Sequence, residues 1–285
     1  FEPNLEPVRY ALSSIVASKV SERPLVIIME STVQPGTTRR CIQDAVEDED
    51  PSEVGIHMAY CPERVSPGDG GYGVGDVGRV IGSYSPELTA TLAEMYRGIT
   101  SGTVTPVSSI EVAEASKLVE NAQRDIDIAF VNELAILLPK MGLDVEEVLA
   151  AASTKWNFHR HTPGIGVGGH CIPVDPYYYI SLSEKVGETS DISNSAREMN
   201  RRMPAHSSEQ ILGLIGEINE PRVLVLGYSY KPEVGASRET PVLPLVENLH
   251  FSGVDVLVWD PKVLESDFPS WIDIVEDPLG VEVDV

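Results

Sequence analysis

A glycine-rich stretch that ends in a cysteine is the first place in this sequence where chemistry is expected. Residues 163–176 read PGIGVGGHCIPVDP, with Cys171 four residues before Asp175. Glycines let the backbone approach a ligand closely, while Pro173 and Pro176 keep the segment out of a helix interior. A thiol and a carboxylate on such a loop suit covalent catalysis, the cysteine as nucleophile and the acid positioning water. A lone cysteine is more often a small buried hydrophobe, so the polar setting carries this interpretation.

Basic and amide side chains supply further candidates. Lys117 and Asn121 stand four residues apart in a helical pattern and share one face with Glu114. Such residues more often form a solvated face of a helix. Asparagine is mildly unfavourable in the middle of a helix, however, so Asn121 indicates a functional role. Lys231 and Arg238 follow a predicted strand and suit a phosphate or carboxylate. Ordinary surface cations are the alternative for this pair.

Two other turns are predicted at the ligand edge of a sheet. Residues 30–38 (ESTVQPGTT) bring hydroxyls and free amides to the start of a helix, which suits a phosphate or a polar ligand group. Residues 61–64 (CPER) follow a predicted strand, where ligands gather in open α/β sheets. Cys41 is predicted to pack in an amphipathic helix, whereas Cys61 suits either packing or chemistry.

Histidines near the glycine-rich stretch raise the alternative of a zinc protein. His159, His161 and His170 precede or adjoin Cys171, and imidazole and thiolate are the usual zinc ligands. Their spacing fits no compact zinc finger or ribbon and leaves Asp175 without a role. We therefore predict no metal, with zinc kept as a hypothesis of another class.

The dinucleotide fingerprint G-x-G-x-x-G occurs twice, at residues 73–78 and 164–169. It carries meaning only between a strand and a helix, where backbone amides and the helix dipole hold a pyrophosphate. The first copy runs into a predicted strand and the second into prolines. No dinucleotide loop of this pattern is therefore predicted.

Composition limits the class of protein. The chain has 285 residues, 44 acidic and 21 basic, with a net charge of -23, which excludes nucleic acid as a partner. Three cysteines make no disulfide framework and favour a reducing, cytoplasmic location. No apolar run approaches the roughly 20 residues that span a bilayer, so no membrane partner is expected. Residues 1–4 resemble neither a signal peptide nor a natural initiation.

Hydrophobic periodicity predicts two α/β regions around a helical middle. In residues 1–106 we expect helices at 6–20 and from 85, and strands at 25–29, 54–60, 79–82 and 103–106. In residues 107–205 we expect helices at 109–141, 144–152, 177–186 and 192–202. In residues 206–285 we expect strands at 222–227, 254–260 and 272–275 and a helix at 240–251. The fold class is α/β, two Rossmann-like doubly wound domains joined by a long central helix and a small all-helical middle domain.

The long helix predicted from Ser109 to Met141 is apolar around much of its circumference and is closed by Gly142. A helix buried on several sides is usually a spine between domains or the core of a dimer.

Several motifs, taken in order, resemble one enzyme family. They are ESTVQPGTT at 30–38, YCPER at 60–64, EASKLVEN at 114–121, GGHCIPVD at 168–175, and GYSYKP at 227–232 with RETP at 238–241. Together they resemble the UDP-glucose/GDP-mannose dehydrogenase family over nearly the whole chain. TKWNFHR at 154–160 and the following Pro163-Gly164 resemble the branch that oxidises UDP-N-acetylhexosamines.

The resemblance implies a four-electron oxidation of the sugar C6 alcohol to a carboxylate with two NAD, and a place in polysaccharide biosynthesis. It casts Cys171 as the thiol that captures the aldehyde as a thiohemiacetal and then carries the thioester. The resemblance also implies that Lys117 stabilises the developing oxyanion, that Asn121 orients this oxygen, and that Glu63 assists thioester hydrolysis. Asp175 and Thr32 would hold or activate water. The implied ligand contacts are those of Lys231, Arg160 and Gly168 with the substrate, and those of Ser31, Thr32 and Arg238 with the cofactor. A homodimer through the long helix is implied as well.

The sequence also departs from the family. The first strand, the glycine fingerprint and the acid that binds ribose have no counterpart, and the end of the nucleotide-sugar domain is missing. We therefore expect a fragment that lacks the amino-terminal NAD fingerprint, in which residues 1–106 are a partial NAD-binding domain and residues 206–285 a partial UDP-sugar-binding domain. A non-catalytic, dimeric nucleotide-sugar-binding module is the alternative, as is UDP-glucose as the substrate.

Overall fold

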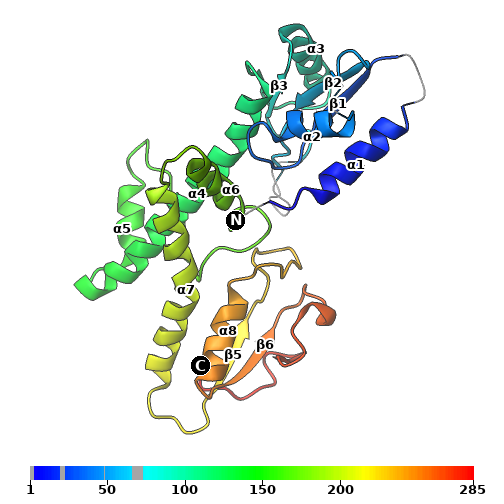
Figure 1. Cartoon of the computed structure of the whole chain (residues 1–285). Coiled ribbons are helices and arrows are strands. Elements are labelled where there is room, and N and C mark those ends of the chain that lie inside the picture. The colour runs from blue at the N-terminus through cyan, green and yellow to red at the C-terminus, as the bar shows by residue number, and fades with distance from the viewer. Residues whose placement is uncertain (1–2, 20–22, 48, 66–72) are drawn as a thin grey trace. The chain divides into compact units, whose positions relative to one another are not determined.

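The computed structural model of the protein describes residues 3–19, 23–47, 49–65 and 73–285 (Figure 1). The chain divides into two compact units. The first comprises Phe1–Asn121 and Tyr177–Thr189, and the second comprises Ala122–Pro176 and Ser190–Val285. Helices α4 (Ile110–Leu137) and α6 (Asp175–Lys185) each run from one unit into the other. The three-domain division at residues 106 and 205 stays a prediction.

The first unit is built on one mixed sheet in the order β1-β2-β3-β4. Its strands are β1 (Leu25–Met29), β2 (Ile56–Tyr60), β3 (Arg79–Ser83) and β4 (Val104–Pro106). The pairs β1–β2 and β3–β4 are parallel, as the doubly wound prediction requires, but β2 and β3 are antiparallel. Helices α2 (Thr37–Ala45) and α3 (Pro86–Arg97) provide the two parallel crossovers. The described residues between β2 and β3 contain no helix, so the chain returns in the opposite direction.

Helices cover both faces of this sheet because successive side chains of β2 point to opposite sides. Met58 and Tyr60 pack with α1 (Glu6–Ala17) and α2, whereas Ala59 and Cys61 pack with α3. Cys41 of α2 is buried in the first cluster, which confirms its predicted packing role. Helix α1 was predicted to reach Val20, which lies outside the described residues.

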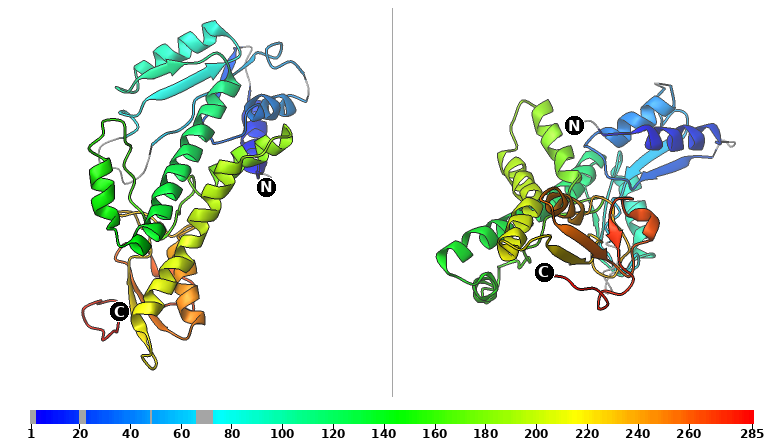
Figure 2. Two further views of the ribbon diagram at one scale, coloured as in Figure 1. Left: turned by 90° about the vertical axis from the view of Figure 1, so that its left-hand side faces the viewer. Right: turned by 90° about the horizontal axis from the view of Figure 1, so that it is seen from below.

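The second unit has its own parallel sheet in the order β5-β6-β7. Its strands are β5 (Arg222–Leu226), β6 (Asp255–Trp259) and β7 (Asp273–Ile274), and its helices include α5 (Val145–Ala152), α7 (Asp191–Ile215) and α8 (Val242–Phe251). Helix α8 lies between α7 and the sheet (Figures 1 and 2), and its buried face packs on Val256, Val258 and Ile215. The α/β prediction for this region is confirmed.

Prolines explain where the helices depart from prediction. Helix α4 ends at Leu137 rather than Met141, because Pro139 begins a 3₁₀ turn (Pro139–Met141) that Gly142 closes at φ 73°. Helix α6 starts at Asp175, with Pro176 in its first turn, where no amide hydrogen is needed. Helix α7 runs through Pro204 to Ile215 instead of ending near residue 202. None of the helices among the described residues is long and apolar enough to cross a membrane.

Candidate active site

Cys171 lies on a tight turn in the second unit. It is exposed, whereas Cys41 and Cys61 are buried. The amide of Asp175 donates to the carbonyl oxygen of Cys171 at 2.7 Å, and the amide of Val174 donates to the same oxygen at 3.0 Å. Asp175 is buried and opens helix α6. Cys171 and Asp175, predicted as nucleophile and water-positioning acid, are therefore held by one turn.

Close packing explains the glycines that precede this turn. A Cβ atom on Gly168 would lie 2.6 Å from Tyr230 Cβ and 2.7 Å from the carbonyl oxygen of Glu239. A Cβ atom on Gly169 would lie 2.7 Å from the Tyr230 ring. The amide of Gly169 also donates to the carbonyl oxygen of Arg238 at 3.2 Å. Only glycine lets residues 163–170, the glycine loop, lie this close to the loop that carries Lys231 and Arg238.

Two helices hold the other end of the glycine loop. The amide of Gly164 donates to Asn132 Oδ1 of α4 at 2.9 Å, and Asn132 Nδ2 donates to Asn200 Oδ1 of α7 at 2.9 Å. A Cβ on Gly166 would lie 3.0 Å from the carbonyl oxygen of Asn200. Pro204 lacks the amide hydrogen that would otherwise bond this carbonyl, so the proline inside α7 frees the backbone where the loop packs.

A buried ion pair extends this network. Arg197 Nη1 donates to Asp125 Oδ1 at 2.6 Å, and Asn200 Nδ2 donates to the same oxygen at 2.7 Å. The Asp125 side chain is 1% exposed and that of Arg197 7% exposed. Burial raises the pKa of Asp125, although Arg197 and Asn200 oppose that effect. Asp125 and Asn132 were missed in the sequence, where their spacing of seven residues on one helix face was the available signal.

The loop after β5 carries the cations predicted to bind a ligand. The amides of Tyr228 and Ser229 donate to Asp260 Oδ2 at 2.8 and 2.9 Å. Hydrogen bonds from these amides hold the pKa of Asp260 below its usual value, although burial opposes them. Lys231 is half-buried and Arg238 is exposed. This loop lies at the carboxyl end of β5, as predicted, where open α/β sheets bind ligands.

In the first unit, Lys117 and Glu63 are in contact. Lys117 Nζ of α4 donates to the main-chain carbonyl oxygen of Glu63 at 2.8 Å. Asn121, four residues further along α4, is buried. Two sites that the sequence suggested separately, one on a helix and one after a strand, are therefore joined.

The carboxylate of Glu63 is held by three donors. The amides of Arg64 and Val65 donate to Oε1, each at 2.6 Å, and Arg79 Nη1 donates to Oε2 at 2.9 Å. Burial opposes the charged form, but these hydrogen bonds outweigh it and lower the pKa of Glu63. Arg79 was missed by sequence reasoning. The available signal was a charged residue at the start of a strand with a buried pattern.

Residues 30–38 are predicted to offer free amides to a phosphate or a polar ligand group, and the structure corrects this at the start of α2. The amides of Gly36 and Thr38, at the start of α2, donate to the two carboxylate oxygens of Glu114 at 2.5 and 2.8 Å. Glu114 is fully buried, so it is no solvated face residue either. Burial raises its pKa, although the bonds from Thr38 and Gly36 oppose that effect. A side chain of α4 therefore takes the place of an external anion.

The remaining predicted residues lie as follows. Ser31 is exposed beyond the end of β1, and its carbonyl oxygen accepts a hydrogen bond from Tyr60 Oη at 3.1 Å. Thr32 is half-buried beside it. Arg160 pairs with Glu146 of α5 at 2.5 Å. Ser31 and Thr32 therefore follow the carboxyl end of β1, the edge at which open α/β sheets bind ligands.

The predicted zinc alternative concerns His159, His161, His170 and Cys171. In the part of the chain that the structure describes, no group of three or more histidine, cysteine, aspartate or glutamate side chains converges as a metal site would require. His161 Nε2 lies 3.6 Å from Asp127 Oδ2 instead.

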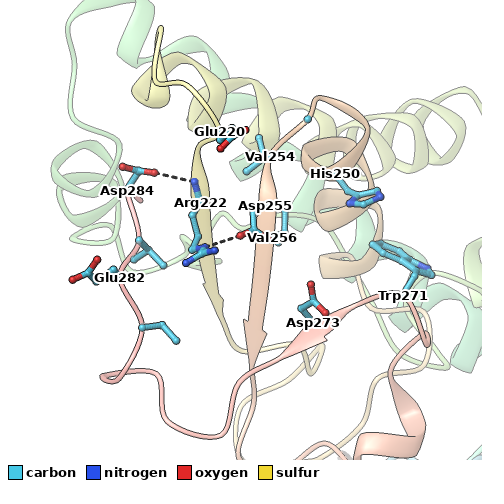
Figure 3. A pocket seen from close by; sticks show the side chains of 13 residues that line it. Glu220, Arg222, His250, Val254, Asp255, Val256, Trp271, Asp273, Glu282 and Asp284 are labelled. Carbon is cyan, nitrogen blue, oxygen red and sulfur yellow. Dashed lines mark hydrogen bonds and ion pairs between the residues drawn. The ribbon is translucent and has the colours of Figure 1, made fainter.

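A cavity of about 1110 Å³ lies elsewhere in the second unit (Figure 3). It adjoins the amino-terminal ends of β5 and β6, where Arg222 pairs with Asp255 at 2.6 Å and its amide bonds Asp284. The loop with Lys231 follows the opposite, carboxyl-terminal end of β5. The cavity is therefore not the predicted ligand edge.

Comparison with known proteins identifies three domains of one family. Residues 2–100 match the UDP-glucose/GDP-mannose dehydrogenase family, NAD binding domain. Residues 111–202 match the central domain of that family, and residues 224–278 match its UDP binding domain. Residues 2–100 thus form an NAD-binding domain, in the region where a partial one is predicted, which corrects the expectation that the amino-terminal NAD part is lacking. The match extends from α1 to α3 and does not depend on a G-x-G-x-x-G pattern between a strand and a helix.

Individual proteins agree with the family match. The chain is 37% identical to UDP-N-acetyl-D-glucosamine 6-dehydrogenase of Pseudomonas aeruginosa, covering 93% of this chain and 64% of that protein. UDP-D-ManNAc dehydrogenase of Pyrococcus horikoshii superposes with a TM-score of 0.83 at 32% identity, over 92% of this chain and 63% of that one. A UDP-glucose dehydrogenase of Pyrobaculum islandicum gives 0.87 at 26% identity, over 96% and 64%. The chain thus spans somewhat less than two thirds of these relatives.

Proposed function

The chain belongs to the UDP-glucose/GDP-mannose dehydrogenase family, and from this premise we propose that the protein oxidises the C6 hydroxyl of a UDP-N-acetylhexosamine to the uronate. One observation carries the proposal. Cys171 is exposed on a glycine-lined turn that also holds Asp175, while Cys41 and Cys61 are buried. A nucleophile must be reachable, and this cysteine meets that requirement.

The chemistry assigned to Cys171 has three steps. Oxidation of the alcohol yields a C6 aldehyde, and Sγ adds to its carbon as the thiol proton passes to the oxygen, giving a thiohemiacetal. Loss of a second hydride from C6, with release of the hydroxyl proton, gives a thioester. Water then adds to the carbonyl carbon, the C–S bond breaks, and the products are the carboxylic acid and the free thiol. NAD, when bound, accepts one hydride in each oxidation, so two are consumed.

The neighbouring residues divide the remaining work. Lys117 stabilises the developing oxyanion, and its contact with the Glu63 carbonyl supports a fixed position for that charge. Asn121 orients the same oxygen from the next turn of α4. Asp175 and Thr32 hold or activate water, and Glu63 assists thioester hydrolysis.

Ligand-binding roles follow the two sheet edges. We propose that Lys231, Arg160 and Gly168 contact the nucleotide sugar. The close packing of Gly168 on the loop that carries Lys231 supports a joint role for these two segments. We propose that Ser31, Thr32 and Arg238 contact NAD, because Ser31 and Thr32 follow the carboxyl end of β1 in the NAD-binding domain.

The substrate class and the assembly are narrower proposals. The Pseudomonas and Pyrococcus relatives are named for UDP-N-acetylated hexosamines, which favours that class over UDP-glucose. Exposed apolar side chains on α4, among them Val119 and Phe130, support a homodimer through this helix. A nucleophilic cysteine that must stay reduced suits a reducing, cytoplasmic location, and we propose a place in polysaccharide biosynthesis.

Replacement of Cys171 by serine tests the proposal in the complete protein. NADH formation would be followed with UDP-GlcNAc, UDP-ManNAc, UDP-glucose and GDP-mannose. We expect Cys171→Ser to lower uronate formation at least about 100-fold, since the thioester can no longer form. Cys41→Ala, a change at a buried packing cysteine, serves as the matched control and should retain turnover.

Unchanged uronate formation in Cys171→Ser would overturn the nucleophile assignment. Binding of a UDP-sugar without any NADH signal in the parent protein would instead favour the non-catalytic binding module.

A further inference from the structure

Arg79 is a buried cation whose guanidinium is aimed at a carboxylate of the proposed site. It begins β3, its side chain is 3% exposed, and Nη1 donates to Glu63 Oε2 at 2.9 Å. Arg79 Nε has no hydrogen-bond partner among the described residues. Burying a guanidinium costs desolvation free energy, which only a well-placed partner offsets. The pairing of Arg79 with Glu63 therefore needs an explanation.

The two oxygens of Glu63 are not equivalent. Oε1 accepts two main-chain hydrogen bonds, from Arg64 and Val65, which use both of its lone pairs. Oε2 accepts one, from Arg79, and the Glu63 side chain remains 42% exposed. Oε2 is therefore the oxygen with capacity left to bind water or accept a proton.

Tyr96 and Cys61 are titratable groups that lie near Arg79. Its guanidinium carbon lies 6.0 Å from the centre of the Tyr96 ring, and Tyr96 Oη donates to Glu30 Oε1 at 2.7 Å. Burial raises the pKa of Cys61 to about 11, so this thiol stays neutral beside the pair. Tyr96 is neutral as well, because burial and its bond to Glu30 raise its pKa.

Two other cations lie near Glu63, Lys117 on α4 and the adjacent Arg64. Lys117 Nζ contacts its main-chain carbonyl at 2.8 Å. Arg64 turns away, pairing with Glu120 of α4 at 2.8 Å and donating to the carbonyl oxygen of Gly78 at 3.0 Å. Among the cations of the described residues discussed above, Arg79 is the one whose side chain pairs with the Glu63 carboxylate.

We propose that Arg79 is a positioning residue for thioester hydrolysis, acting by holding Glu63 Oε2 in its working orientation. The proposal rests on the proposed function. In the hydrolytic step, a proton of the attacking water passes to Oε2 while the water oxygen bonds to the thioester carbon. The C–S bond then breaks, and Sγ of Cys171 leaves with the electron pair as thiolate.

Removal of Arg79 should change the pH dependence of this step in a defined direction. Burial disfavours the Glu63 carboxylate, while Val65, Arg79 and Arg64 favour it. Without the guanidinium the pKa of Glu63 rises, and the carboxylate becomes protonated at a higher pH than in the parent. The acid limb of the hydrolysis rate therefore moves to higher pH.

A double-mutant cycle in the complete protein tests the proposal. The variants are Arg79→Met, Glu63→Gln and the pair, with Arg79→Lys in the same cycle if the methionine variant fails to fold. Steady-state NADH formation, the NADH burst of the first turnover and the mass of Cys171-linked adduct are measured with UDP-GlcNAc. We expect Arg79→Met to slow steady-state turnover roughly 10–100-fold with the burst retained, adduct accumulating and the acid limb shifted upward.

The cycle separates positioning from general support of the fold. If Arg79 acts through Glu63, its replacement adds little in the Glu63→Gln background. Equal losses in both backgrounds, or a slower turnover with no adduct and no shift of the acid limb, would overturn the proposal. A parent protein that gives no burst and no adduct would instead refute the proposed function, so the two failures are distinguishable.

Discussion

Two arginine–carboxylate pairs in this protein have similar contacts, but the pKa values of their carboxyl groups are shifted in opposite directions. In the second unit, Asp125 and Arg197 are 1% and 7% exposed, and burial raises the pKa of Asp125. In the first unit, Arg79 is 3% exposed but Glu63 is 42% exposed, and hydrogen bonds lower the pKa of Glu63 in spite of its partial burial. The arginine is buried in both, so the setting of the carboxylate makes the difference.

This difference distinguishes a carboxylate that supports structure from one suited to chemistry. Asp125 is enclosed between α4 and α7, where it joins the network that reaches Asn132 and Gly164. Glu63 has one oxygen fixed by main-chain amides and the other held by Arg79. A buried pair stabilises mainly because breaking it strands a charge, whereas a half-exposed pair keeps its carboxylate ionised and accessible.

The largest effect is expected at the buried pair. Asp125→Ala removes the carboxylate that both Arg197 and Asn200 bind, and should lower the free energy of unfolding by about 3–5 kcal/mol. Chemical denaturation followed by circular dichroism would measure it. Arg39→Ala is the control, because Arg39 and Glu111 form a pair that is 46% and 35% exposed. Similar losses for the two variants would erase the distinction between buried and exposed pairs.

An intermediate effect is expected where shape rather than charge holds the glycine loop. Gly168→Ala would place a methyl group 2.6 Å from Tyr230 Cβ and should cost about 1–3 kcal/mol by overpacking. Gly164→Ala in the same loop meets nothing within 4 Å and has no positive φ, so it should be close to neutral. Thermal unfolding of both variants checks this. Equal melting temperatures would mean that the buried network alone positions the loop.

The smallest effect is a pH dependence of opposite sign at the two pairs. The pKa of Asp125 is raised in the folded protein, so its contribution to stability falls as pH rises through that raised pKa. The pKa of Glu63 is lowered, so its contribution is present above the usual pKa and is lost as pH falls through the lowered value.

Unfolding free energies measured from pH 3 to 8 for the parent, Asp125→Asn and Glu63→Gln would test the signs. The gap between parent and Asp125→Asn should shrink as pH rises, and that between parent and Glu63→Gln should shrink as pH falls. Gaps that change in the same direction would contradict the comparison.

The sequence by itself determined the types of the elements and the residues of the motifs. Short apolar runs, alternating patterns and helical spacing identified β1, β2, β5 and β6 and the helices α1, α3 and α5 to within a few residues. The boundaries that failed lie at Pro139, Pro176 and Pro204, where a proline ends a helix, opens one, or is tolerated inside one. Neighbouring residues carry enough information for these assignments because secondary structure is a local property of the chain.

Only the tertiary structure decided what the charged side chains do. Arg79 meets Glu63 across 16 residues of sequence, Asn200 meets Asp125 across 75, and Glu114 caps α2 across 78. No local pattern distinguishes a buried carboxylate of this kind from a solvated one. Whether a charge is enclosed, paired or left accessible depends on which distant elements the fold brings against it, and that sets its pKa and its role.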